Sequence, residues 1–277
     1  MSADFGRTTD VAARVCSTKE VAQAMYVTRL ETADATRARP GQFVQLRVAQ
    51  DISPWLRIPL SVCAVDARSA TVDVLYEDVG PKTHLLSQLP VGSCVSCMGP
   101  LGNAFPEPGT SAAILVGGGI GLPPLMFHGQ RILEGDSTAP VYLLAGARTA
   151  SKHLPDSLLE SSASTIAKAT DDGTLGHHGL VTDLLLEKLD GVEDAVVYTC
   201  GPHPMMAAVA AVCRDRHVTC HASLEEYMAC GFGVCVGCVV ELEQSAGALA
   251  GGSSPYYRYS RICVDGPVYD AADIKWT

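Results

Sequence analysis

The sequence is short of positive charge and of long hydrophobic runs. Its 20 lysines and arginines stand against 30 aspartates and glutamates, and the formal charge of −10 argues against a nucleic-acid partner held by phosphate neutralisation. The longest uncharged, largely apolar stretch, residues 111–127, is broken by glycines and prolines and falls short of the roughly 18–20 residues of a membrane helix. There is no repeat of solenoid period. We therefore expect a chain without a membrane span.

Residues 1–7 also lack the apolar core of a secretory signal, although the chain holds 11 cysteines. We expect these cysteines to be reduced thiols or metal ligands in the cytoplasm. Charged residues make up only 18% of the chain and hydrophobic residues 47%, which is typical of a compact fold rather than a disordered one. A length of 277 residues predicts about two domains, with room for a small third module.

The N-terminal part shows a period of two. Between residues 21 and 98 apolar side chains alternate with polar ones, as in Val44, Leu46 and Val48, and pairs of turn residues such as Pro40-Gly41 interrupt the pattern. Short strands at this spacing predict a small antiparallel barrel or sandwich.

A different alternation begins after a linker at residues 106–109. Apolar strand-like runs alternate with helix-length amphipathic runs, which predicts an α/β domain with a parallel sheet. The strands are expected at 112–116, 141–145, 195–200 and 218–222, and the helices at the run ending at residue 133, at 181–189 and at 205–216. Beyond residue 223 follow a stretch rich in glycine and cysteine, a flexible segment at 245–255 and a short closing stretch.

Four cysteines carry the strongest motif. Cys230, Cys235, Cys238 and Cys263 have the CxxxxCxxC…C spacing of plant-type 2Fe-2S sites, in which four thiolates hold two irons. The glycines at 231, 233 and 237 suit a loop that brings its backbone close to the sulfides, and we expect positive φ angles there. A structural zinc site and buried cysteines without a metal stay open as alternatives.

A glycine-rich turn, residues 115–124, follows the first strand of the α/β region and opens a helix. Such a turn lets a diphosphate approach backbone N–H groups at a helix N-terminus. The acidic residue of a Rossmann dehydrogenase is missing from residues 145–148, so the turn predicts a nucleotide site of another kind. Cys200 and Gly201 end a later strand of the same sheet and should border the same crevice as Gly119.

For several other cysteines, and for a pair of histidines, we expect structural roles. Cys94 and Cys97 lie in a probable strand, where residues three apart face opposite sides, and His177-His178 lies in a polar loop near the nucleotide crevice. Cys16, Cys63, Cys213 and Cys220 are expected to be small buried apolar residues.

Taken in order, the motifs resemble the ferredoxin-reductase superfamily, and most closely the electron-transfer subunits of NAD-dependent dihydroorotate dehydrogenases. The matching stretches cover nearly the whole chain: residues 59–61, 99–105, 117–125, 200–202, 223–226 with the cysteine loop, and 261–269. The resemblance implies a mixed fold with an N-terminal antiparallel β-barrel that binds FAD (1–105), a central parallel-sheet α/β domain that binds NAD (106–222) and a small C-terminal 2Fe-2S domain (223–277).

The same resemblance implies particular cofactor contacts. Flavin contacts would fall at Ile58, Pro59, Leu60, Ser61, Leu75, Tyr76, Glu77, Lys82 and Thr83, and the nicotinamide near Gly119, Gly121 and Cys200. Three positions depart from the family pattern. Ile58 stands where the family has an arginine that meets the FAD diphosphate, Tyr227 replaces a basic residue, and Lys82-Thr83 replaces a Gly-Thr turn. Lys82 is a candidate for the missing charge, whereas the neighbouring Arg57 would point to the opposite face of a strand.

The implied activity is electron transfer. Electrons from a partner, an FMN-containing subunit that oxidises dihydroorotate in pyrimidine biosynthesis, would enter at the cluster, pass to FAD and leave as hydride to NAD+. A heterotetramer with that subunit is implied, and no acid or base side chain is required of this chain. Two alternatives stay open: an NAD(P)H-dependent flavin and iron–sulfur reductase subunit that serves another partner, and a zinc-stabilised, nucleotide-binding regulatory module.

Overall fold

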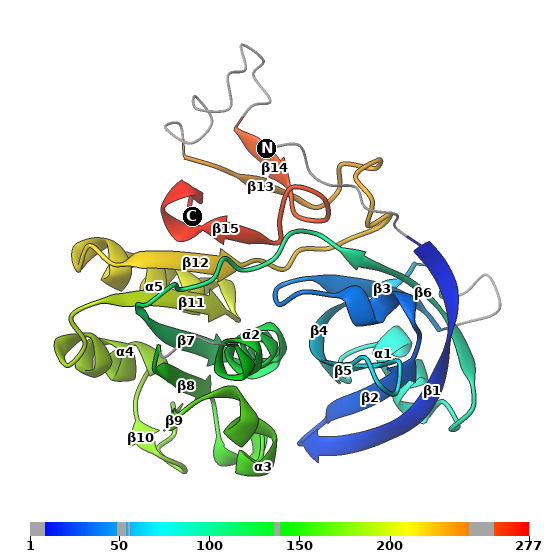
Figure 1. Cartoon of the computed structure of the whole chain (residues 1–277), viewed down its shortest axis with the longest axis horizontal. Coiled ribbons are helices and arrows are strands. Elements are labelled where there is room, and N and C mark those ends of the chain that lie inside the picture. The colour runs from blue at the N-terminus through cyan, green and yellow to red at the C-terminus, as the bar shows by residue number, and fades with distance from the viewer. Residues whose placement is uncertain (1–8, 49–53, 55, 136–138, 244–257, 277) are drawn as a thin grey trace.

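The computed structural model describes residues 9–48, 54, 56–135, 139–243 and 258–276. The flexible segment expected at 245–255 lies outside these residues. Figure 1 shows a barrel on one side, an open α/β sheet on the other, and the C-terminal segment across the top of both. No helix among the described residues has the length and apolar character needed to cross a membrane.

Six antiparallel strands close the barrel. The strand order is β1-β2-β5-β4-β3-β6, and one short helix, α1 (Pro81–Gln88), connects β5 to β6. Val44 and Leu46 point inward and are fully buried, as the period of two predicts. The predicted antiparallel barrel is thus confirmed. Its strands are β1 (Thr9–Ala22), β2 (Met25–Glu31), β3 (Phe43–Arg47), β4 (Ile58–Asp66), β5 (Thr71–Glu77) and β6 (Cys94–Leu101), with a 3-10 turn at Asp34–Arg37.

Seven strands form the second sheet, in the order β10-β9-β8-β7-β11-β12-β15. Every neighbouring pair is parallel except β12 and β15, so the predicted parallel sheet is confirmed. The strands are β7 (Ala112–Gly118), β8 (Val141–Ala147), β9 (Thr165–Thr170), β10 (His177–His178), β11 (Ala195–Cys200), β12 (Thr219–Ser223) and β15 (Val268–Asp270). The helices are α2 (Leu122–Glu134), α3 (Asp156–Leu159), α4 (Val181–Asp190) and α5 (His203–Asp215), with 3-10 turns at Gly119–Gly121, Ala150–Lys152 and Glu160–Ser162.

The C-terminal segment lies over both the barrel and the parallel sheet. β13 (Val239–Glu241) pairs with β14 (Tyr259–Arg261) in a small separate sheet, and the chain then returns as β15 to the edge of the parallel sheet. A last 3-10 turn spans Ala271–Asp273. The closing stretch therefore both completes the cysteine region and extends the α/β sheet.

Helix α2 fixes the barrel against the sheet. It packs on β7 and β11 with one side and on β4 of the barrel with the other, and its Phe127 belongs to the barrel core. Lys152 reaches from the sheet unit to Glu77 of β5, with 2.6 Å between Nζ and Oε1. These contacts hold the two large units at a set orientation, so a cleft between them has defined walls.

All eleven cysteines lie in the described residues and are free. Cys63, Cys213 and Cys220 are buried as predicted, while Cys16 is only half-buried. Cys94 is exposed and Cys97 buried, which confirms that they face opposite sides of β6. Burial raises the pKa of Cys63 and of Cys97 to about 12, so both thiols stay protonated and unreactive at neutral pH.

Candidate functional site: a cleft beside a cysteine loop

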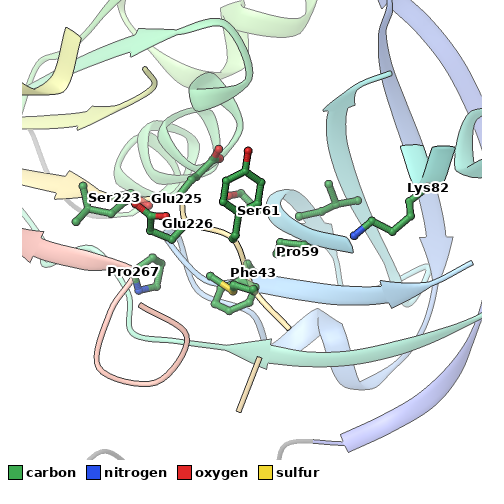
Figure 2. Close-up of a pocket in the computed structure, with 12 residues that line it drawn as sticks. Phe43, Pro59, Ser61, Lys82, Ser223, Glu225, Glu226 and Pro267 are labelled. Carbon is green, nitrogen blue, oxygen red and sulfur yellow. The ribbon is translucent and has the colours of Figure 1, made fainter. Parts of the chain in front are cut away.

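A cleft of about 350 Å³ opens between the barrel and the segment that follows β12. Figure 2 shows Lys82 reaching in from the barrel side, opposite Ser223, Glu225 and Pro267. The wall residues come from β3, β4, α1, the stretch 223–228 and the residue before β15. They are Phe43, Pro59, Leu60, Ser61, Lys82, Ser223, Leu224, Glu225, Glu226, Tyr227, Met228 and Pro267.

The alternation of β4 decides which predicted flavin residues reach this cleft. Ile58 and Leu60 are buried, whereas Pro59 and Ser61 are half-exposed and lie at the cleft wall, where Leu60 also contributes. Of the nine predicted flavin positions, Pro59, Leu60, Ser61 and Lys82 line the cleft. The structure thus brings together residues from two barrel elements that are far apart in sequence.

The other predicted flavin positions have contacts of their own. Leu75 and Tyr76 are buried, and the Tyr76 hydroxyl lies 3.0 Å from Thr28 Oγ1. Glu77 forms the ion pair with Lys152. The Thr83 hydroxyl accepts hydrogen bonds of 3.1 Å from the N–H groups of residues 79 and 80, and so closes the start of α1.

The segment after β12 contributes residues that the sequence interpretation did not assign to the site. Glu225 is exposed to solvent, yet the protein atoms around its carboxyl group raise its pKa to about 7 by desolvation. Tyr227 is 95% exposed at the same wall. The sequence held a signal for these residues, because 224–226 directly follow a strand of a parallel sheet, and ligands bind at such strand ends.

The cysteine loop begins two residues beyond Met228. The N–H group of Cys235 donates a 3.4 Å hydrogen bond to Cys230 Sγ, and the thiols of Cys238 and Cys263 lie beside each other. Burial acts to raise the pKa of Cys230, but backbone N–H donors from residues 232, 234 and 235 outweigh it and lower that pKa to about 6. Burial and the neighbouring Cys238 raise the pKa of Cys263 to about 12. The loop thus offers two thiol pairs, one of them surrounded by N–H donors.

This donor set fits a two-iron cluster. Four thiols with backbone N–H groups aimed at sulfur are the ligands and hydrogen bonds that such clusters use. In the described part of the chain no three His, Cys, Asp or Glu side chains are placed to hold one metal ion. Two separate thiol pairs suit two irons better than one zinc.

The loop glycines follow the prediction only in part. Gly231 and Gly233 have φ of 78° and 85°, as expected. Gly237 has no positive φ, so the prediction is wrong there; Val236 instead adopts φ 55°. Close packing also explains why residue 231 is a glycine, because a Cβ there would clash with Nε2 of the fully buried Gln45. Gln45 belongs to β3, so the cysteine loop rests directly on the barrel.

The glycine turn between β7 and α2 contains two kinds of glycine. Gly119 has φ 55°, and a Cβ there would meet nothing within 4 Å, so its backbone is open to a ligand. A Cβ on Gly121 would lie 2.2 Å from the carbonyl oxygen of Cys200, so this glycine serves close packing of the turn on β11. Cys200 pairs with Gly117, and its thiol is fully buried with a pKa raised by desolvation. The three predicted nicotinamide positions therefore lie together, with only Gly119 facing open space.

Comparisons with known proteins follow this division of the chain. Residues 225–275 match the family model of the iron–sulfur cluster binding domain of dihydroorotate dehydrogenase B, and residues 115–211 match that of the oxidoreductase NAD-binding domain. The electron transfer subunit of dihydroorotate dehydrogenase B (NAD(+)) from Geobacillus kaustophilus is 37% identical over 239 residues, 85% of this chain and 86% of the relative. That from Desulforamulus reducens is 34% identical over 267 residues, 95% and 97% of the two chains. The chain belongs to the family of dihydroorotate dehydrogenase B electron-transfer subunits.

Solved structures agree on the fold of this dihydroorotate dehydrogenase B subunit family. A structure described for flavin-based electron bifurcation in NADH-dependent reduced ferredoxin-NADP oxidoreductase superposes with a TM-score of 0.81 at 26% identity, and covers 98% of this chain and 92% of its own. The ferredoxin reductase of carbazole 1,9a-dioxygenase has a TM-score of 0.67 at 21% identity, over 76% and 66% of the chains. The predicted family, the fold class and the oxidoreductase electron-transfer activity are confirmed. An electron-transfer subunit works with a separate catalytic subunit.

Proposed function

We propose that the chain carries electrons from an FMN-containing, dihydroorotate-oxidising catalytic subunit through a 2Fe-2S cluster and FAD to NAD+, in a heterotetramer of pyrimidine biosynthesis. One observation carries the proposal: residues 223–228 line the cleft, and the same segment reaches the first cysteine of the four-thiol loop two residues later. The eleven free cysteines support a cytoplasmic location, because thiols stay reduced there.

The cluster ligands in this proposal are Cys230, Cys235, Cys238 and Cys263. The two thiol pairs and the N–H donors around Cys230 support it. Cys235→Ser should abolish the visible absorption of the cluster and leave FAD bound, because the cleft wall contains no cysteine. Cys94→Ser, at an exposed position on β6, is the matched control and should keep both chromophores.

The flavin ring would lie in the cleft against Pro59, Leu60 and Ser61, with Lys82 at the barrel side. Ile58, Leu75, Tyr76, Glu77 and Thr83 stay predictions as flavin contacts. The nicotinamide would approach from the glycine turn, where Gly119 is open to a ligand and Gly121 and Cys200 pack behind it. We assign residues 1–105 to the FAD domain, 106–222 to the NAD domain and 223–277 to the cluster domain, and β15 of the last extends the sheet of the second.

The division into three sites has a chemical reason. When bound, the cluster exchanges single electrons, the nicotinamide exchanges a hydride, and the flavin does both. The chain's own residues orient these groups and control solvent access. Ser61 of the barrel and Glu225 of the segment after β12 both line the cleft in Figure 2, while the contact of α2 with β4 holds the two cofactor units together.

A different electron partner is the alternative that a specific observation favours, because the structure with TM-score 0.81 belongs to a bifurcating oxidoreductase. Co-purification separates the two. Recovery of an FMN-containing catalytic subunit supports the proposal, and consistent recovery of another partner contradicts it.

The test of the whole proposal uses the lone chain, purified without oxygen. Iron, FAD and a visible spectrum should be present, NADH should reduce an added dye, and dihydroorotate should leave the flavin oxidised. Bleaching of the flavin by dihydroorotate would refute the division of labour. A colourless chain with one zinc would support the regulatory-module alternative instead.

A further inference from the structure

The acidic side chains of the cleft wall would repel the negative diphosphate of a dinucleotide unless a nearby cation offsets them. The diphosphate of FAD is negative, yet the cleft is lined by two carboxylic acid side chains, Glu225 and Glu226. Lys82 is the single basic side chain among the lining residues.

Two residues at the start of β4, Arg57 and Ile58, provide no free cation to the cleft. Ile58 is apolar and 5% exposed. The guanidinium of the neighbouring Arg57 donates hydrogen bonds of 2.6 Å to Asp10 Oδ2 and 2.8 Å to Ser96 Oγ, neither of which lines the cleft. An arginine tied to two other partners is not free to bind phosphate.

The ammonium group of Lys82 lies next to the backbone at the start of β4, where Ile58 provides no charge. Its Nζ donates a 3.0 Å hydrogen bond to the carbonyl oxygen of Arg57, the peptide that precedes Ile58. Figure 2 shows the side chain extending from α1 toward Pro59. Lys82 also belongs to the first turn of α1, where unpaired N–H groups and the helix dipole favour an anion. Partial burial lowers the pKa of this lysine, which is the cost of holding an ammonium group at the wall without a counter-ion.

We propose that Lys82 binds the diphosphate of the flavin dinucleotide and so sets the preference of this chain for FAD over flavins without a diphosphate. The inference rests on the proposed function and goes one step beyond it. The start of α1, rather than β4, thus supplies the cation for the diphosphate.

The experiment compares FAD and riboflavin on the full chain after removal of its flavin. We expect Lys82→Met to weaken FAD binding roughly 10- to 100-fold, the loss of one or more hydrogen bonds to a charged group, and to leave riboflavin binding unchanged. The FAD affinity of Lys82→Met should also depend less on salt than that of the wild type. Lys188→Met, on α4 near Tyr142, removes one positive charge elsewhere and should change neither affinity.

Two further measurements decide the role of the lysine. Lys82→Arg should keep most of the FAD affinity, because it keeps a cation at the same position on α1. The two phosphorus resonances of bound FAD should shift in Lys82→Met while the flavin absorption spectrum stays the same, a readout that does not need a weak riboflavin complex.

Equal FAD affinity and unshifted phosphorus resonances in Lys82→Met would overturn the inference. An equal loss for FAD and riboflavin would assign Lys82 a structural role only, which also overturns it. A wild-type chain that binds no flavin would instead contradict the proposed function, so the two failures are distinguishable.

Discussion

At the residue scale, the two outer glycines of the cysteine loop differ in what a side chain would meet. Gly231→Ala would place a methyl group 2.1 Å from the Gln45 amide at φ 78°, whereas a Cβ on Gly237 meets only Cys235 Sγ at 3.5 Å. We expect Gly231→Ala to displace the loop, at a cost of about 1–3 kcal/mol, and to lower the iron content per chain.

Gly237→Ala is the matched control and should keep its iron. Iron analysis and the visible spectrum of both variants check the prediction. Equal iron content in the two variants would show that the contact with Gln45 does not hold the loop.

The raised pKa of Glu225 predicts that the free energy of unfolding depends on pH. Its folded-state pKa of about 7 lies above the ordinary value of 4.5, so the folded state favours the protonated carboxyl group. The corresponding stability is fully present below pH 4.5 and is lost as the pH rises through 7. Because Glu225 is open to solvent, we expect a loss of about 1 kcal/mol in the free energy of unfolding.

Glu225→Gln should remove this part of the pH dependence. Denaturant unfolding at pH 5 and pH 8 measures it, and parallel changes in the variant and the wild type would contradict the assignment. The carboxyl group also lines the cleft, so the comparison is best made on chains with the same flavin content.

At the scale of elements, one side chain joins the barrel end to the closing strand. Asn103 follows β6, and its amide accepts a 2.9 Å hydrogen bond from Val268 N–H and donates a 2.8 Å bond to Val268 C=O, so it pairs with β15 as a strand would. Asn103→Ala should leave both backbone groups of Val268 without these partners and lower the free energy of unfolding by about 1–3 kcal/mol.

The same substitution should also reduce cluster retention, because Cys263 lies just before β15. Thermal unfolding and iron content are the measurements, and Ser111→Ala, which removes an exposed bond to Asp194, is the control. Full iron content in Asn103→Ala would mean that the closing strand is held by its sheet pairing alone.

The sequence predicts elements well where one pattern controls them. Period-two runs identify the barrel, and continuous apolar runs identify β7, β8 and β11, because strands buried on both faces need apolar residues throughout. β9 was not predicted, because Thr165–Thr170 contains a lysine, two threonines and small residues near the edge of the sheet. β15 has only three residues and exists through its pairing with β12 and its contact with Asn103, which no local pattern reveals.

The candidate site shows the same limit. The thiol spacing predicts a four-cysteine loop without any tertiary information. Which flavin positions face the cleft depends on the pleat of β4 and on how the barrel meets the segment after β12. Glu225 and Tyr227 were therefore missed as site residues, although they lie at a strand end where such residues are expected.

At the scale of the whole molecule, apolar side chains gather on the outside of the cysteine loop. Phe232, Val234 and Val236 are all more than half exposed, with Val234 at 73%. Large exposed apolar groups beside one another are typical of a protein interface. We expect Val234→Glu to weaken co-purification with the catalytic subunit, because a charge would have to be desolvated on binding.

The lone-chain reduction of a dye by NADH should survive in Val234→Glu, since the glycine turn and the cleft do not include it. Val91→Glu, equally exposed on the barrel, is the control. Unchanged recovery of the partner in both variants would place the interface elsewhere.

The return of the chain from β14 to β15 also imposes an order on assembly. Three of the four thiols lie on one loop, and the pairing of β14 with β13 holds Cys263 near them. The pairing of β15 with β12 then joins the same segment to the parallel sheet, whose contacts are far apart in sequence and so form late in folding. The four thiols therefore reach their final places only in an almost finished fold, and we expect iron to load late rather than to nucleate folding.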